Sequence, residues 1–177
     1  GLIANSKFLD LVRRGSGSAP RSLLGGLVEL HRDDGRLEQL CAPETWPISM
    51  VVVRLTHERK AVSSRQGMAH TQRTSPYYRS WVTQHPTDLA EARQAIARRD
   101  LEALGAVMER STMRMHACML AADPPLRYLK AATLTVLDAV QEMRGHGLSA
   151  WATMDAGPHV KILCHRDEVP IVVERMS

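Results

Sequence analysis

A single carboxylate stands between two apolar runs near the end of this 177-residue chain. The run Trp151 to Met154 leads to Asp155, and Ala156-Gly157-Pro158 then supplies the small residue, the free φ and the fixed φ of a tight turn. The second run, His159 to Leu163, alternates polar and apolar residues, which is typical of a half-buried strand. We therefore predict a strand, a turn and a strand, with Asp155 at the last strand position and its carboxylate pointing off the sheet. Such a carboxylate can act as a base or bind a substrate, although Asp also commonly caps a turn through its own backbone.

A second candidate is the run from Arg14 to Leu30, which is rich in glycine and serine near its start. Backbone N–H groups and the hydroxyls of Ser16 and Ser18 can surround an anion, and the Arg21 guanidinium can donate two hydrogen bonds to it in bidentate geometry. The same composition is typical of a flexible Gly/Ser turn. The run has neither the spacing of a P-loop nor that of a dinucleotide-binding loop.

The third candidate is the stretch from Val62 to Met68, where two serines precede an arginine. Ser64 and Arg65 have the chemistry to bind a phosphate group. Alternatively, the serines simply cap the start of a helix.

Composition limits the functions that these residues can serve. The formal net charge is +4, with no basic run and no interleaved aromatic residues, which favours a small anionic ligand over nucleic acid. The three cysteines are odd in number and far apart, and the histidines lack a metal-binding spacing, so we expect a reducing compartment and no zinc or disulfide framework. No apolar run approaches the ~20 residues that span a bilayer, and the first residues lack the pattern of a signal peptide. We expect a cytoplasmic protein without a membrane partner.

The remaining pattern predicts an α+β fold, a two-layer α/β sandwich. Strands are expected at Leu37–Cys41 and Ile48–Leu55, the second in a sheet interior because of its continuous β-branched run. Helices are expected from Ser75-Pro76, from Thr87 with Asp88 and Glu91 as a capping box, from Asp100, and over Leu129–Met143 with Leu134 facing inward. Methionines recur along the Asp100 helix at core spacing, and His116 beside them is expected to be half-buried with its hydrogen bonds satisfied.

Several of these segments together carry a resemblance to a known family. They are Gly15 to Ser22 with Gly25-Gly26, Ser63 to Met68, Met113 to Ala117, Pro124 to Tyr128, and Met154 to Pro158. In this order they closely resemble the diphosphomevalonate decarboxylases of the GHMP kinase superfamily, from about Leu9 to Leu163. The resemblance implies a GHMP-type C-terminal domain over residues 46–177, incomplete at its end, preceded by the end of the N-terminal domain over residues 1–45.

The resemblance also implies a reaction of the mevalonate pathway of isoprenoid biosynthesis. Family members use ATP and Mg²⁺ to phosphorylate the 3-hydroxyl of 5-diphosphomevalonate, and loss of phosphate and CO₂ then gives isopentenyl diphosphate. Asp155 matches the catalytic aspartate, and Arg21 matches the arginine at the substrate's carboxylate region. The other matching residues surround the substrate: Ser16 and Ser18 in the same pocket, and Ser64 and Arg65 near the hydroxyl and the diphosphate, with Ser64 expected to take part in catalysis.

Two departures from the family qualify this expectation. The family usually has Asn where this chain has His159. The family's N-terminal half, with a Tyr-Trp-Gly-Lys-like segment and a phosphate loop that holds ATP, is absent from this sequence. We therefore predict neither ATP-binding residues nor metal ligands here.

Three hypotheses follow for the function. The chain is the C-terminal part of a diphosphomevalonate decarboxylase, with a homodimer or a separate N-terminal chain as partner. Alternatively it belongs to a GHMP-family kinase or decarboxylase acting on a related mevalonate phosphate. In the third hypothesis it is a non-catalytic or half-enzyme module that needs a partner chain.

Overall fold

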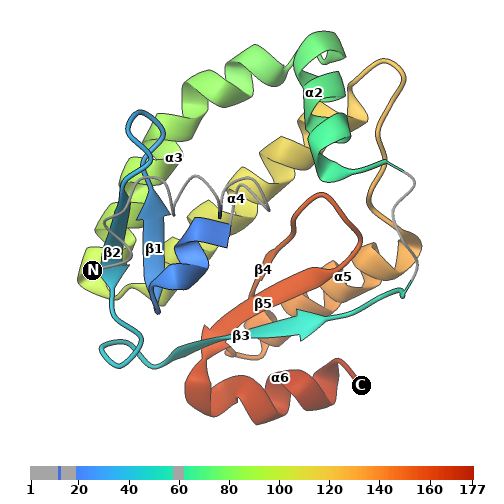
Figure 1. Cartoon of the computed structure of the whole chain (residues 1–177). Helices are drawn as coiled ribbons and strands as arrows, with labels where there is room; N and C mark the ends of the chain where they lie inside the picture. Colours follow the sequence, from blue (N-terminus) through green and yellow to red (C-terminus); the bar gives the residue numbers. More distant parts are fainter. Residues whose placement is uncertain (1–11, 13–18, 58–61) are drawn as a thin grey trace. The chain divides into compact units, whose positions relative to one another are not determined.

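The computed structural model describes residue 12 and residues 19–57 and 62–177 (Figure 1). Contacts within the chain divide it into two compact units, residues 1–47 and residues 48–177, and each is described by itself. The Gly15–Ser18 segment, with the candidate residues Ser16 and Ser18, lies outside the described residues.

The first unit is built on a β-hairpin. A short 3₁₀ helix, η2 (Ala19–Leu23), precedes β1 (Leu27–Leu30), which pairs antiparallel with β2 (Leu37–Cys41). The predicted strand Leu37–Cys41 is thus confirmed. Gly35 has a φ of 69° in the turn between the strands, a conformation that glycine adopts without steric cost.

The second unit contains an antiparallel three-stranded sheet in the order β3-β5-β4 (Figure 1). Its strands are β3 (Ile48–Val53), β4 (Trp151–Thr153) and β5 (Val160–His165). The central strand is β5, and its Val160, Ile162 and Cys164 are fully buried. β3 lies at an edge of the sheet among the described residues, so its expected place in a sheet interior is wrong, and Val52 remains 61% exposed. A β-branched run alone does not distinguish a central strand from an edge strand.

The helices α5 (Ala131–Gly145) and α6 (Val169–Arg175) form the layer against this sheet, with the 3₁₀ turn η3 (Arg166–Glu168) leading into α6. Val140 and Met143 of α5 and Val172 of α6 share one core cluster with buried residues of β4 and β5. The predicted α+β two-layer arrangement is confirmed. Leu134, which was expected to face inward, is exposed.

Three further helices, α2 (Ser64–Thr74), α3 (Tyr78–Arg98) and α4 (Leu101–Leu120), complete the second unit. Asp100 caps α4 as expected, because its Oδ1 accepts a 2.9 Å hydrogen bond from the Ala103 N–H. α3 is one continuous helix through Pro86, although the sequence predicts a break before Thr87. Ser75 ends α2 rather than capping α3, which begins at Tyr78.

α4 contacts the sheet at β4. The Thr112 and Thr153 hydroxyls lie 2.9 Å apart, and a Cβ placed on Gly105 would meet the Trp151 ring at 2.0 Å. α4 therefore runs close beside the strand that leads to Asp155.

Candidate functional site

Asp155 lies two residues beyond β4, which ends at Thr153, so it belongs to the turn and not to the strand. Its side chain is 79% exposed, and its Oδ2 forms an ion pair and hydrogen bond with the Lys161 ammonium group of β5. Oδ1 has no hydrogen-bond partner in the described part of the chain. The turn itself is closed by a 2.8 Å hydrogen bond from the Gly157 N–H to the Asp155 carbonyl. Lys161 therefore orients the carboxylate, and Oδ1 can accept a hydrogen bond from solvent or a ligand.

The far end of this turn is attached to two other elements. The buried Thr133 hydroxyl of α5 donates a 3.0 Å hydrogen bond to the Pro158 carbonyl. The Leu55 N–H, just after β3, donates to His159 Nδ1 at 3.1 Å. Both the helical layer and the edge strand thus hold the segment that follows Asp155.

The first turn of α2 presents Ser64 and Arg65. The helix is capped by Ser63, whose Oγ accepts from the Gln66 N–H while the Gln66 side chain accepts from the Ser63 N–H. Ser64 and Arg65 are both exposed. The helix-capping alternative is thus confirmed for Ser63, whereas the phosphate-binding role of Ser64 and Arg65 stays a prediction.

Tyr128 connects the start of α2 with the Asp155 turn. Its hydroxyl donates to the Val62 carbonyl at 3.2 Å, and its ring packs in one cluster with Met119 and Ala156. A Cβ on Gly67 would meet the Tyr128 hydroxyl at 2.3 Å, so α2 and this ring approach more closely than any other residue would permit. Burial raises the pKa of the Tyr128 hydroxyl. One side chain therefore contacts both of the segments that the sequence singles out in this unit.

His116 of α4 lies behind the same turn and is only 2% exposed. Burial lowers its pKa, and an interaction with the backbone of Asp155 partly opposes that effect. Its Nε2 has no hydrogen-bond partner within the described ranges. The expectation of a half-buried, satisfied histidine is therefore wrong, because α4 turns this ring fully inward.

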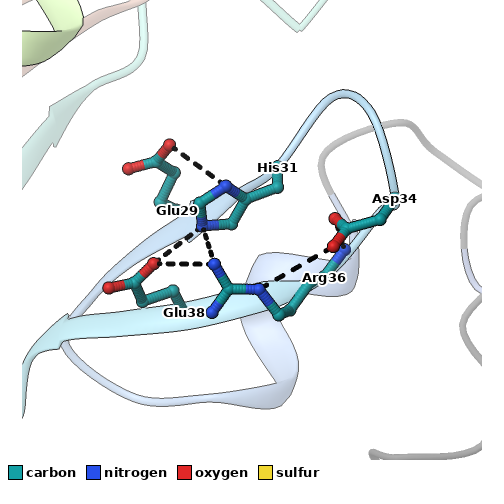
Figure 2. A network of polar contacts seen from close by, with 5 residues as sticks. All are labelled: Glu29, His31, Asp34, Arg36 and Glu38. Carbon is teal, nitrogen blue, oxygen red and sulfur yellow. Dashed lines mark hydrogen bonds and ion pairs between the residues drawn. The ribbon is translucent and has the colours of Figure 1, made fainter.

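In the first unit, Arg21 lies on η2 and is exposed. Ser16 and Ser18 lie outside the described residues. The described polar cluster of this unit is instead on the hairpin, where His31 lies between Glu29 and Glu38 beside Arg36 (Figure 2). His31 Nε2 is 2.7 Å from Glu38 Oε2, and Arg36 Nη2 is 3.3 Å from the same oxygen. The Arg36 backbone N–H, 2.9 Å from Asp34 Oδ1, lowers the pKa of that carboxyl. These contacts close the hairpin turn.

Asp88, expected to cap a helix, is instead a buried charge within α3. Arg114 Nη1 of α4 donates to its two oxygens at 2.6 and 2.7 Å, and Arg110 Nη2 donates to Oδ1 at 3.2 Å. Arg110 also pairs with Glu91, and that hydrogen bond is the main cause of its raised pKa. The capping-box prediction is wrong because α3 continues through Pro86, which places Asp88 in the helix interior facing α4.

A pocket of about 330 Å³ opens between α3 and α4, and no sequence-predicted site residue contributes to it. It is lined by Tyr77, Ser80, Trp81, Gln84, Arg114, Ala117 and Cys118. Over the described ranges, no three His, Cys, Asp or Glu side chains gather as a metal site. None of the helices in those ranges is long and apolar enough to cross a membrane.

Comparison with known proteins decides the family. The sequence model described as the mevalonate 5-diphosphate decarboxylase C-terminal domain matches residues 50–177. The chain belongs to this family. Bovine diphosphomevalonate decarboxylase is 33% identical over 175 residues, which cover 93% of this chain and 44% of that protein.

Solved decarboxylases share the fold. The crystal structure of mevalonate diphosphate decarboxylase from Staphylococcus aureus superimposes with a TM-score of 0.86 at 36% identity, covering 96% of this chain and 53% of that one. A structure of MDDEF in complex with MVAPP, AMPPCP and magnesium gives a TM-score of 0.87 at 33% identity, covering 97% and 54%. This chain thus spans about half the length of the decarboxylases that it matches.

Within this decarboxylase domain, three contacts that hold the Asp155 turn were not predicted from the sequence. Lys161 pairs with Asp155, Thr133 holds Pro158, and His159 accepts from Leu55. Only Lys161 has a signal in the sequence. It lies opposite Thr153, two residues before Asp155, so the hairpin that the sequence predicts brings Lys161 to the side of the Asp155 turn.

Proposed function

We propose that the protein containing this chain is a diphosphomevalonate decarboxylase, which converts 5-diphosphomevalonate and ATP to isopentenyl diphosphate, ADP, phosphate and CO₂. The γ-phosphoryl group of ATP passes to the 3-hydroxyl. The C3–O bond then breaks as phosphate leaves, the C1–C2 bond breaks as CO₂ leaves, and its electron pair forms the C2=C3 double bond.

The observation that carries this proposal is the exposed, oriented carboxylate of Asp155 in a chain of the decarboxylase family. A tertiary alcohol is a poor nucleophile, so a carboxylate within hydrogen-bond reach that orients or takes its proton is useful. Oδ2 of Asp155 is engaged by Lys161, which leaves Oδ1 to accept a hydrogen bond from the substrate hydroxyl.

We assign the remaining site residues by the match of their segments to the family, and their chemistry suits those roles. Arg21 binds the substrate carboxylate region with Ser16 and Ser18. Ser64 and Arg65, exposed on the first turn of α2, bind near the hydroxyl and the diphosphate, where the partial positive charge of a helix N-terminus favours an anion. A substrate with a carboxylate at one end and a diphosphate at the other accounts for arginines in two separate segments.

We propose that the full-length protein uses ATP as its co-substrate together with a magnesium ion. The complex of MDDEF with AMPPCP and magnesium supports their use in this family. The described residues offer no cluster of His, Cys, Asp or Glu for a metal ion, so we assign no magnesium ligand among them. Location in the cytoplasm and assembly as a homodimer or with a separate N-terminal chain are further proposals.

The test uses the full-length protein and the variant Asp155→Asn, which keeps the shape of the side chain and removes its charge. We expect kcat for CO₂ release to fall by about 10²–10⁴-fold, the usual contribution of a general base. Asp138→Asn, on the exposed side of α5, is the matched control and should retain the wild-type rate. Full activity in Asp155→Asn would refute the assignment, and a phosphorylated acid formed without CO₂ would indicate a kinase instead.

A further inference from the structure

His159 lies where the pairing of β3 with β5 ends. The last backbone pair joins Val53 to Val160, and the residue before His159 is Pro158, which has no N–H to offer. Beyond this point the Leu55 N–H donates to His159 Nδ1 at 3.1 Å. A side chain therefore extends the contact between two strands after the backbone ladder has stopped.

The direction of this hydrogen bond fixes which nitrogen of the neutral imidazole carries the proton. A backbone N–H can only donate, so Nδ1 must present its lone pair and a neutral ring must carry its proton on Nε2. The bond joins residues 104 positions apart in the sequence. Without it, the half-buried Leu55 N–H would lose its partner at the end of the sheet nearest the Asp155 turn.

The segment that follows Asp155 is anchored at two adjacent residues. The turn has one anchor at the Pro158 carbonyl, held by Thr133, and a second at the next residue, held by Leu55. Two adjacent anchors from two different elements prevent the start of β5 from pivoting. Lys161, which orients the Asp155 carboxylate, is two residues further along the same strand.

We propose that His159 is a positioning residue, whose Nδ1 ties the Asp155 turn to the end of β3 and so holds the carboxylate in its reactive place. This proposal rests on the proposed function, in which Asp155 meets the substrate hydroxyl. The ring itself takes no proton from the substrate.

Two amide variants separate this role from general packing. In Asn, Oδ1 occupies the place of Nδ1 and can accept from Leu55, whereas Gln places its acceptor one bond further out, near the place of Nε2. In the full-length protein we expect His159→Gln to lower kcat for CO₂ release about tenfold, with KM for 5-diphosphomevalonate changed less than twofold, because a small misplacement of a reacting group slows the chemical step. The His159→Asn variant should keep kcat within about twofold of the wild-type value.

Hydrogen exchange of the Leu55 amide gives a readout that needs no activity. Protection should fall about tenfold in His159→Gln and be kept in His159→Asn, while thermal unfolding confirms that both variants are folded. Equal kcat values in the Gln and Asn variants, or an unchanged Leu55 exchange rate in the Gln variant, would overturn the proposal. A wild-type protein that releases no CO₂ would overturn the proposed function itself, and Leu55 exchange would still decide whether the His159 bond exists.

Discussion

His116 carries a titratable ring into the interior directly behind the Asp155 turn. Burial lowers its pKa below the ordinary histidine value of 6.5, so folding disfavours the protonated form of the ring. The unfolded chain takes up a proton near that value, and below it the unfolded state binds more protons than the folded state. By linkage, the free energy of unfolding rises with pH through this range and falls as the solution is acidified.

We therefore expect the free energy of unfolding to fall as the pH drops from about 7 to about 5. His116 contributes at most about 1.4 kcal/mol to this loss for each pH unit below the ordinary histidine pKa. Urea unfolding at several pH values measures this slope. His116→Met, an apolar replacement that can adapt to the space, should flatten it, whereas the exposed His85→Gln should leave it unchanged. A His116→Met variant as pH-sensitive as the wild type would assign the effect to other groups.

At the scale of elements, Tyr128 joins α2 to the turn after β4. Removing only its hydroxyl in Tyr128→Phe should cost about 0.5–1.5 kcal/mol, the usual net value of one hydrogen bond, because the ring keeps its contacts with Met119 and Ala156. Chemical denaturation measures the loss. Tyr77→Phe is the matched control, since Tyr77 is 59% exposed, and it should be neutral. Equal effects of the two substitutions would show that the hydroxyl of Tyr128 contributes nothing.

The contact of α4 with β4 depends on the absence of a side chain at Gly105. An added Cβ would meet the Trp151 ring at 2.0 Å, and a ring can move only by displacing its own neighbours. We expect Gly105→Ala to destabilise the protein by about 1–3 kcal/mol, the cost of overpacking a tight contact. At Gly145, near the end of α5, nothing lies within 4 Å of an added Cβ. Gly145→Ala should therefore be neutral or stabilising by up to about 1 kcal/mol, and a stable Gly105→Ala variant would contradict the described contact.

Across the whole molecule, the features that the sequence predicts well are those encoded by neighbouring residues. The cap at Asp100, the strand Leu37–Cys41 and the turn after Asp155 each depend on residues within a few positions. The two-layer arrangement also follows from the order of strands and helices. The site candidates Asp155, Ser64 and Arg65 are singled out by residue type and position, and the match of their segments to a family gives them roles that stay a prediction.

The features that the sequence does not reveal depend on distant partners. Nothing near Asp88 signals that arginines more than 20 positions away will pair with it in the interior. Similarly, the pairing of His159 with Leu55 requires the register of β3 against β5. The edge position of β3 is decided by which strands come beside it, and its own residues do not encode that choice.

The close approach of Gly105 to Trp151 also constrains how such chains can diverge. The indole lies against the bare backbone of α4 on one side, with the Arg144 guanidinium 4.4 Å from its ring centre. Volume gained at position 105 must be given up at position 151, so the two positions are free to change only together. Among descendants of this sequence, a larger residue on α4 should be accompanied by a smaller one at the start of β4, a correlation visible in sequences alone.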